Sequence, residues 1–442
     1  MKSFYERIKR SSSNDVPTES ISPPSVEALP TPREECEEDN PIHLNLKLSL
    51  RTDIGGMVEN QDDCFVWRHG SSGSVVIGVL DGHGRDVGQL AAQGAKAFML
   101  EWLDSNWETV LQDPAAAMRV LFSATHSHLR QAFRDHLTSQ GWVVKENNGY
   151  LMKRRSLATP WSCVHGGTSG SLVAIVQGKK LVIANVGDSS AIMAAKDGIL
   201  GQGDLRQHSW WDDGGGEMDD LGTTGVAKSS DSQYLVLTAD HSPESPREFK
   251  RMRNACPDPQ NKHLPTLIVV YDSPSTNKLR CSPVFDVDTS GTPKVTGRGR
   301  YYKNVRHEWA SLVATPMRAR FQDALAFTRS LGDFHIQTYG VTHIPDVLSL
   351  DLTQVLQRAR EQGGNEAVAC IAACSDGIWD NWLWEDVGGF FIDRLPQVQE
   401  VDSSEAVTEE FMVENARRAK ANFGDQADNA TCVACYLFIS GG

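Results

Sequence analysis

The sequence predicts an α/β fold, with one domain of about 400 residues that carries two insertions. Two observations predict it. Near-continuous apolar runs recur along the chain, as expected of strands that are covered on both faces. Segments with the helical spacing of apolar residues lie between the early runs. The runs are SVVIGVL, GSLVAIV, KLVIANV, YLVLTAD, EAVACIAAC and ATCVACYLFI.

The first part of the chain differs in composition from the rest. Residues 1–41 are rich in Ser, Pro and Glu and lack apolar periodicity, so we expect a disordered tail there. The domain is expected over 42–442. Its first strand is predicted at 43–51, where every second residue from Leu44 to Leu50 is a leucine, and a second strand follows at 64–67.

Two helices have recognisable ends. Asp113 is placed to cap one helix, and Pro114 suits its first position. Apolar residues then recur at helical spacing from Met118 to Phe133. Near the carboxyl end, another helix is expected over 403–423, closed by Gly424.

Two stretches interrupt this order. The segment near 201–232 is rich in Gly and Asp, and the segment near 256–320 mixes Pro, Ser, Thr and basic residues without clear periodicity. Loops of this length are usually functional or disordered. We expect both to be insertions in the domain, and a merely solvated role explains them equally well.

Composition narrows the possible partners. The chain has 442 residues and a formal net charge of −14, which disfavours binding to nucleic-acid phosphates or anionic membranes. No apolar run reaches the roughly 18 residues that cross a bilayer, and the amino terminus lacks the apolar core of a secretory signal. We therefore expect a cytoplasmic or nuclear protein, a monomer without nucleic-acid or membrane partners.

The nine cysteines are an odd and modest number, which argues against a secreted disulfide framework. Cys432 and Cys435 lie at an odd offset in a strand and should point to opposite faces. Cys370 and Cys374 share a face but are about 13 Å apart along a strand. Neither pair suits zinc, so we interpret all four as buried core residues.

Aspartates mark the ends of four apolar strands. Asp81, Asp188 and Asp376 follow three of them, and Asp428 precedes the last. If the strands lie side by side with these ends together, the carboxylates converge and need a hard cation such as Mg²⁺ or Mn²⁺. Gly82 would let its own carbonyl approach the ion. Each Asp-Gly taken alone is more often a simple turn; four together favour a metal site.

The chain also resembles a known family, the metal-dependent type 2C serine/threonine protein phosphatases, from about residue 45 to 438. The resemblance implies a four-layer α-β-β-α sandwich, with two central β-sheets flanked by helices. It is carried by an ordered set of motifs: DGHG, GGTSGSLVAI, LVIANVGDSSA, LTADHSPESP, LAFTRSLGDF, THIPDV, CSDGIWDNW and DNATCVACYL.

The resemblance also implies roles for particular residues. Two Mg²⁺ or Mn²⁺ ions would be held by Asp81, the Gly82 carbonyl, Asp376 and Asp428, and Asp188 would serve a third, weaker site. A metal-activated water would hydrolyse phosphoserine and phosphothreonine in protein substrates. His83 resembles the general acid for the leaving oxygen, and Asp62 is the catalytic acidic residue retained from the family's first motif.

The first motif departs from the family pattern, which usually reads Arg-x-x-x-Glu-Asp. Here Met57 replaces the arginine that grips phosphate, and Gln61 replaces the glutamate that orders metal-bound water. A lost charge-assisted hydrogen bond costs roughly 1.5–3 kcal/mol, so phosphate binding should weaken. Arg85 is a candidate substitute for substrate binding, and a plain surface arginine is the alternative.

Other residues of the matched motifs are expected to have structural roles. Thr168 and Ser169 are expected to pack the strand after their turn. Arg329 and Asp333 are expected to form a buried ion pair beneath the site. The stretch 256–320 lies about where the family carries its variable flap, which helps to choose substrates.

Three functions compete. An active protein phosphatase is favoured by the retained metal-ligand and acid positions. A pseudophosphatase, acting as a scaffold or inhibitor that binds phosphoproteins with little turnover, is favoured by Met57 and Gln61. A phosphohydrolase of small molecules is the third possibility, although the long insertions suit a macromolecular substrate better.

Overall fold

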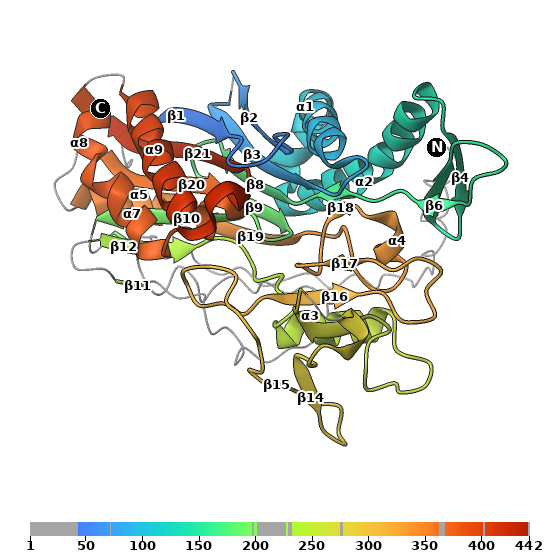
Figure 1. The fold of residues 1–442 in the computed structure, drawn as a ribbon. Coiled ribbons are helices and arrows are strands. Elements are labelled where there is room, and N and C mark those ends of the chain that lie inside the picture. Colours follow the sequence, from blue (N-terminus) through green and yellow to red (C-terminus); the bar gives the residue numbers. More distant parts are fainter. Residues whose placement is uncertain are drawn as a thin grey trace, which may run out of the picture. The chain divides into compact units, whose positions relative to one another are not determined.

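The computed structural model describes residues 43–70, 72–196, 199–200, 227–228, 232–274, 277–361, 367–400 and 403–440. The predicted tail at 1–41 and most of the first predicted insertion lie outside the described residues. Within these ranges the chain is a mixed α and β structure with antiparallel sheets and packed helices (Figure 1), which confirms the predicted mixture of elements.

The first large sheet is antiparallel throughout its described pairs and has the order β18-β7-β3-β8-β9-β19, with β2 also paired to β3. Its strands are β2 (Asp62–His69), β3 (Ser74–His83), β7 (Gly167–Thr168), β8 (Gly170–Val176), β9 (Lys180–Val186), β18 (Leu331–Gly332) and β19 (Asp346–Asp351).

The second large sheet has the order β1-β21-β20-β10-β12-β11 in the described residues and is also antiparallel. The predicted first strand is β1, although Leu50 at its far end is exposed rather than half-buried. The strands are β1 (His43–Asp53), β10 (Ser190–Lys196), β11 (Ala227–Lys228), β12 (Ser232–Val236), β20 (Ala367–Cys374) and β21 (Ala430–Ser440).

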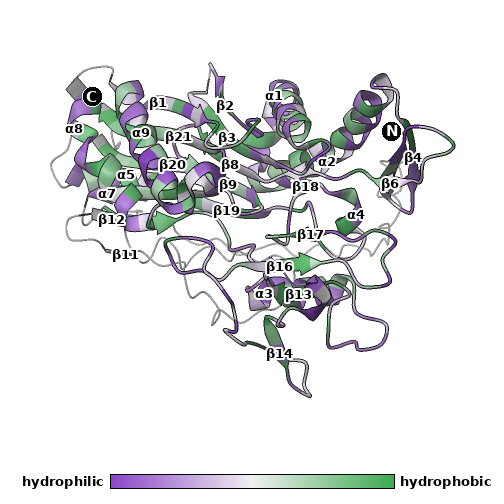
Figure 2. Ribbon diagram, viewed as in Figure 1, coloured by the Kyte–Doolittle hydropathy of each residue, from purple (hydrophilic) through white to green (hydrophobic). Residues whose placement is uncertain are grey.

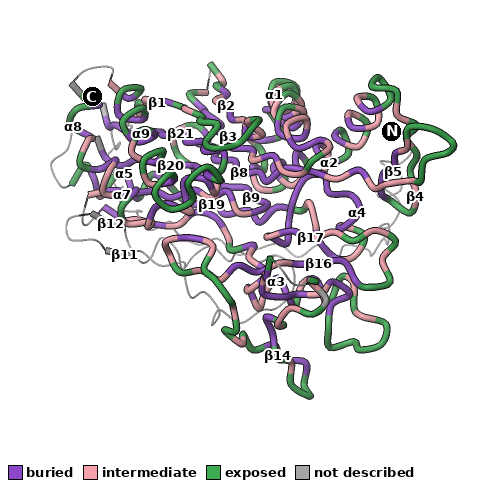
Figure 3. Tube along the Cα trace, viewed as in Figure 1, coloured by how far each residue is buried: buried purple, intermediate pink, exposed green. Residues whose placement is uncertain are grey.

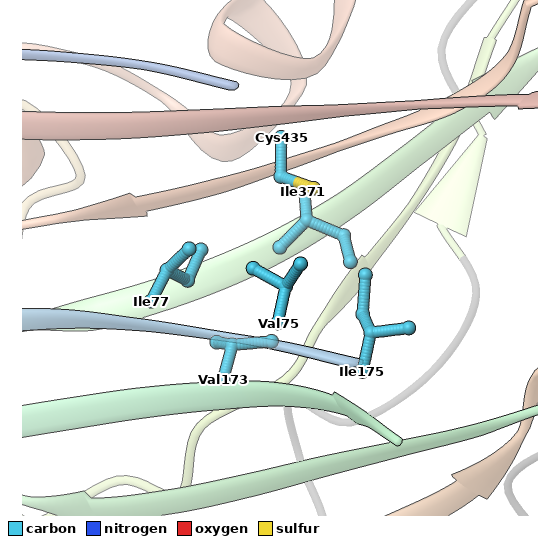
Figure 4. A pocket seen from close by; sticks show the side chains of 6 residues that line it. All are labelled: Val75, Ile77, Val173, Ile175, Ile371 and Cys435. Atoms are coloured by element: carbon cyan, nitrogen blue, oxygen red, sulfur yellow. The ribbon is translucent and has the colours of Figure 1, made fainter. Parts of the chain in front are cut away.

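The two sheets share an apolar core because their strands are apolar on both faces. In β3, Val75, Ile77 and Val79 pack into the core shared with the second sheet, while Val76 and Leu80 pack into the core on the other side. Figure 4 shows side chains of both sheets pointing toward one another. The space between them does not admit a water molecule. The side chains are Val75, Ile77, Val173, Ile175, Ile371 and Cys435.

Helices pack on the other faces of the two sheets. The helices α1 (Gly88–Gln112) and α2 (Pro114–Ser139) share a core with the first sheet. The second sheet shares a core with α6 (Asp376–Trp379), α7 (Trp384–Asp393), α8 (Leu395–Glu400) and α9 (Ser404–Phe423). Hydrophobic residues gather along the central strands (Figure 2), and much of the trace of these strands is buried (Figure 3).

The predicted helix ends are confirmed. Asp113 caps α2 by accepting a hydrogen bond from the Ala116 amide at 3.0 Å, and Pro114 is its first residue. Gly424 ends α9 with a φ of 62°. A further helix, α5 (Leu352–Glu361), inserts its apolar face into the core between the sheets.

The described part of the segment 256–320 is folded, which contradicts the alternative of a merely solvated loop. It contributes half of the buried residues of a separate apolar core, which it shares with α3 (Pro246–Ala255) below the sheets in Figure 1. Its elements, with the neighbouring β17, are β13 (Ile268–Tyr271), η3 (Lys278–Arg280), β14 (Phe285–Val287), β15 (Pro293–Val295), β16 (Ser311–Ala314) and β17 (Ala324–Leu325).

The remaining elements are short. A small sheet has the order β4-β5-β6 beside α2, and a single helical turn follows β18. No helix in the described part of the chain has the length and apolar character needed to cross a bilayer. The elements are β4 (Val143–Asn147), β5 (Tyr150–Arg154), β6 (Ser162–Cys163), α4 (Phe334–Gln337) and η4 (Gly424–Gln426).

The four strand cysteines lie as predicted. Cys370, Cys374 and Cys432 face the core under the helices, while Cys435 faces the core between the sheets. All four are free and buried. The opposite orientations of Cys432 and Cys435 exclude a shared zinc ion, as the strand offset indicates.

A buried histidine makes stability depend on pH. Burial, and then the charges of His343 and Arg130, lower the pKa of His126 to about 2. The unfolded chain therefore binds a proton below about pH 6.5 that the folded chain does not bind, so stability falls as the pH drops below that value. We expect this residue to lower the free energy of unfolding by about 2 kcal/mol between pH 6.5 and pH 5.

Urea unfolding at several pH values checks this expectation. In His126→Gln, the free energy of unfolding should vary less with pH over this range, because the side chain no longer titrates. His128→Gln is the matched control, since His128 is exposed on the same helix. An unchanged slope in His126→Gln would contradict the assignment.

Candidate metal centre

The acidic cluster is assembled from both sheets. Asp81 lies on β3, Asp188 follows β9, and Asp376 begins α6 directly after β20. One carboxylate oxygen of each lies within 4.8 Å of the others. Asp428 precedes β21, and its charge acts on both Asp81 and Asp376.

The predicted convergence therefore occurs for Asp81, Asp188 and Asp376, with Asp428 near enough for its charge to affect them, but not along one row of adjacent strands. The strands β3 and β9 belong to the first sheet, while β20 and β21 belong to the second. The carboxylates meet because the two sheets face each other, a fact about packing that strand order in the sequence does not contain.

The carboxylates repel one another. Loss of hydration, and then the neighbouring carboxylates, hold the pKa of Asp81 and of Asp376 well above the usual value. The buried Oδ1 atoms of Asp62 and Asp376 have no hydrogen-bond partner among the described residues. Crowded carboxylates with unsatisfied oxygens are what a hard divalent cation relieves, so this donor set fits Mg²⁺ or Mn²⁺.

Two glycines allow the close approach of the backbones that carry the ligands. A Cβ at Gly82 would lie 2.4 Å from the Gly88 carbonyl oxygen and 2.5 Å from that of Gln61. A Cβ at Gly377 would lie 2.0 Å from the Asn429 carbonyl oxygen. Any side chain at Gly377 would therefore push the Asp376 helix away from the strand that follows Asp428.

Asp62 is part of the same cluster. It lies directly opposite Asp81 in the β2–β3 pair, and its Oδ2 accepts a hydrogen bond of 2.7 Å from the Ser375 hydroxyl. Burial raises the pKa of Asp62 to about 6, and the Asp428 charge adds to the effect. Asp62 thus links the first sheet to the residue that precedes Asp376.

Thr168 and Ser169 do more than pack their strand. The Thr168 hydroxyl and the Ser169 amide both donate to the Asp81 carbonyl, at 3.0 and 2.8 Å. The Asp81 amide in turn donates to the Ser169 hydroxyl at 3.3 Å. These bonds fix the backbone of Asp81 and thereby position its carboxylate.

His83 has a partner that the sequence did not reveal. Its Nε2 lies 2.7 Å from Oδ2 of Asp333, and the ring of Phe327 meets it edge-on at 5.0 Å. Burial lowers the pKa of His83, but the Asp333 carboxylate outweighs this effect, so the pKa is raised overall. The histidine is held in one orientation beside the cluster.

The predicted ion pair between Arg329 and Asp333 is wrong. Arg329 instead pairs with Glu248 on α3 at 2.6 Å and with Asp346 at 3.0 Å. The chain between Arg329 and Asp333 forms β18 and then turns through the positive φ of Gly332, so the two side chains diverge. Arg329 thus links its segment to α3 through the ion pair with Glu248, and Asp333 is instead the hydrogen-bond partner of His83.

The residues of the altered first motif lie in different settings. Met57 is 43% exposed, in a turn whose Gly56 amide donates to the Ala427 carbonyl at 2.8 Å. Gln61 donates from Nε2 to the Gly84 carbonyl at 3.3 Å, so it is held against the loop after His83. Arg85 is exposed at the surface, and its role in substrate binding stays a prediction.

Two further charged residues belong to this region. Asp380 lies one helical turn after Asp376, and its burial raises its pKa to about 7. Lys303, from the second insertion, lies 3.7 Å from Oε2 of Glu308; burial acts to lower its pKa, but the charges of Asp188, Glu308, Asp380 and Asp376 raise it to about 12. The spacing of four residues in SDGIWD could have suggested Asp380, whereas nothing in the sequence around Lys303 could have placed it here.

Comparisons with known proteins identify the family that this chain resembles. The family model described as Protein phosphatase 2C matches residues 72–208. Among curated proteins, the chain is similar to Probable protein phosphatase 2C 64 of Oryza sativa subsp. japonica, at 21% identity, covering 73% of this chain and 50% of that protein. It is also similar to Probable protein phosphatase 2C 52 of Arabidopsis thaliana, at 23% identity, covering 74% and 53%.

The chain thus spans about half the length of these two relatives. A crystal structure of a serine-threonine phosphatase 2C from Toxoplasma gondii shares the fold, with a TM-score of 0.53 and 13% identity, over 90% of this chain and 96% of that one. The resemblance to the protein phosphatase 2C family expected from the motifs is confirmed by these matches.

The repulsion in the cluster makes a prediction about stability. In metal-free protein, Asp376→Asn should raise the free energy of unfolding by about 1–2 kcal/mol, because one of the crowded charges is removed. Mn²⁺ should stabilise the wild type by about 2.7 kcal/mol at 100 times its dissociation constant, and the variant far less.

Thermal unfolding with EDTA and with Mn²⁺ measures both effects. Asp393→Asn is the matched control, because Asp393 is exposed at the end of α7. If Mn²⁺ stabilised Asp376→Asn as much as the wild type, Asp376 would not be a ligand.

Proposed function

We propose that this protein is a Mg²⁺- or Mn²⁺-dependent protein phosphatase that hydrolyses phosphoserine and phosphothreonine in protein substrates. The observation that carries the proposal is the cluster of Asp81, Asp188 and Asp376, with carboxylate oxygens within 4.8 Å of one another and His83 nearby on the same strand as Asp81. We also propose that the domain has the four-layer sandwich of the family. The protein acts as a monomer and has no nucleic-acid or membrane partners in this proposal.

The ions would be held by Asp81, the Gly82 carbonyl, Asp376 and Asp428. When bound, they supply Lewis-acid activation of a water and neutralise charge on the phosphoryl oxygens. Asp62 would help to position the water that attacks phosphorus. Its Oδ2 is held by Ser375, and its unpartnered Oδ1 is available to orient the attacking water.

His83 is the proposed general acid. Asp333 holds the ring through Nε2, which leaves Nδ1 to deliver a proton to the departing seryl or threonyl oxygen. Because Asp333 also stabilises the imidazolium form, the ring carries the proton it must donate. A general acid of this kind contributes roughly 10²–10⁴ in rate.

A pseudophosphatase is the second candidate, and the altered first motif favours it. Met57 offers no charge to phosphate, and Gln61 is engaged with the Gly84 carbonyl. Activity remains the better-supported function, because a scaffold that binds metal has no use for an oriented general acid, and His83 is held in place by Asp333.

The first test is Mn²⁺-dependent release of phosphate from a phosphothreonine peptide. Wild type should turn over only with the metal, and Asp376→Ala should lose activity by more than a hundredfold, because a metal ligand is gone. Asp393→Asn should match the wild type. Silence in the wild type while it binds Mn²⁺ would instead support the scaffold function.

The missing arginine gives a gain-of-function prediction. Met57→Arg should raise kcat/KM for a phosphopeptide by about 10- to 100-fold, mainly through a lower KM, because a charge-assisted hydrogen bond to phosphate is worth about 1.5–3 kcal/mol. Val58→Arg is the matched control, because Val58 is fully exposed and an arginine there adds the same charge one residue away. Equal gains from both variants would show a general charge effect and contradict a specific phosphate contact.

A further inference from the structure

The small sheet β4-β5-β6 carries two cations on one tryptophan. The Nζ of Lys145 lies 4.3 Å from the centre of the Trp161 ring, and the guanidinium carbon of Arg154 lies 4.4 Å from it. Lys145 is opposite Met152 in the β4–β5 pair and Arg154 is opposite Val143, so both cations project from the same face of the sheet. We call Lys145, Arg154 and Trp161 the basic face.

Neither cation of the basic face has a carboxylate partner among the residues that the structure describes. Lys145 is exposed, and Arg154 is half-buried with a buried Nε that lacks a hydrogen-bond partner there. The chain has 57 acidic and 43 basic residues, so two adjacent cations without a carboxylate run against its overall composition.

The carboxylates on or beside the small sheet are paired with other side chains. The pairs are Glu146 with Arg130 and Arg134, Asp86 with Lys153, and Asp323 with His165. The charges of Lys145 and Arg154 are therefore left to attract a negative group from outside the domain.

The basic face lies close to the metal centre. From Trp161 the chain runs through β6 to His165 and Gly166. The His165 amide donates to Oδ2 of Asp86 at 3.0 Å, and a Cβ at Gly166 would lie 2.7 Å from the His83 carbonyl oxygen. Five residues of extended chain span at most about 17 Å, so Trp161 lies within that distance of the backbone beside His83.

We propose that the basic face is a docking surface for an acidic segment of the phosphoprotein substrate, about five residues from the phosphorylated residue. The inference rests on the proposed function, because it takes the substrate of the metal centre to be a protein. Substrate carboxylates would pair with Lys145 and Arg154. Contact with the Trp161 ring holds both cations in place, which lowers the entropy lost when the substrate binds.

An acidic polypeptide suits the basic face better than a nucleic acid or a membrane does. The net charge of −14 repels an extended polyanion. A short acidic segment responds mainly to charges within a screening length of about 10 Å. The Trp161 ring is also in contact with both cations, which leaves less of its surface for a base to stack on.

Peptide kinetics with the full chain and Mn²⁺ test the inference. One phosphothreonine peptide carries glutamates about four to six residues before the phosphothreonine, a second carries them as far after it, and a third has glutamines at both places. The KM of one acidic peptide should be about three- to tenfold below that of the glutamine peptide, as two exposed ion pairs allow. This advantage should disappear at about 1 M salt, because salt screens exposed charges.

Variants locate the effect. In Lys145→Gln/Arg154→Gln, the ratio of the two KM values should fall to about one, while Lys145→Arg/Arg154→Lys should keep the wild-type ratio. Lys179→Gln/Lys420→Gln is the matched control and should also keep it, since it removes two charges from exposed lysines of the β8–β9 turn and of α9.

Equal KM values for the three peptides in the wild type would overturn the inference and leave the proposed function intact. An acidic advantage that persists in Lys145→Gln/Arg154→Gln would also overturn it, because the glutamates would then bind elsewhere. A single-stranded RNA that binds the wild type more tightly than the acidic peptides, and loses this binding in the double variant, would overturn it in favour of a nucleic acid.

Failure of the proposed function gives a different result. If the wild type turned over none of the peptides, fluorescence anisotropy of the same peptides, labelled, would decide the inference separately. Tighter binding of an acidic peptide that is lost in Lys145→Gln/Arg154→Gln would support a docking surface for acidic polypeptides. Equal binding of all three peptides would overturn it.

Discussion

The structure depends on bringing carboxylates together that repel one another. Asp81 reaches the site on the first sheet and Asp376 and Asp428 on the second, so closing the sandwich forces like charges into contact. The apolar core between the sheets opposes this cost, because the facing strands bury valine, isoleucine and leucine side chains throughout. The glycines at 82 and 377 let the backbones approach closely enough for the charges to share one site.

Much of this site could be predicted from the sequence because its residues occur in contiguous motifs at strand ends. Asp81, Asp188, Asp376 and Asp428 each adjoin an apolar run, so local pattern was sufficient to select them. Local pattern could not reveal which sheet each strand joins. It also gave the wrong partner for Asp333, since the direction of a side chain after a left-handed turn depends on packing. The sequence could not identify Lys303 as a residue of this region, because only the fold of the second insertion brings it there.

The turn that carries Asp333 connects the site to the helical layer. The Gly332 amide donates to Nδ1 of His126 at 3.2 Å, and the His126 ring stacks on His343 at 4.0 Å. The residue after Gly332 is the partner of His83. A neutral, buried histidine on α2 therefore supports the backbone on which the orientation of the general acid depends.

The pairing of β1 with β21 has a consequence for the order of folding. These strands match residue for residue from His43–Ser440 to Asp53–Ala430, so the first described strand of the chain gains its partner only when almost all of the domain exists. Contacts between residues so far apart form late and slow the search for the native state. During synthesis, Asp428 is the last of the four aspartates to be added, just before β21, so the full cluster of charges cannot assemble until most of both sheets has been made.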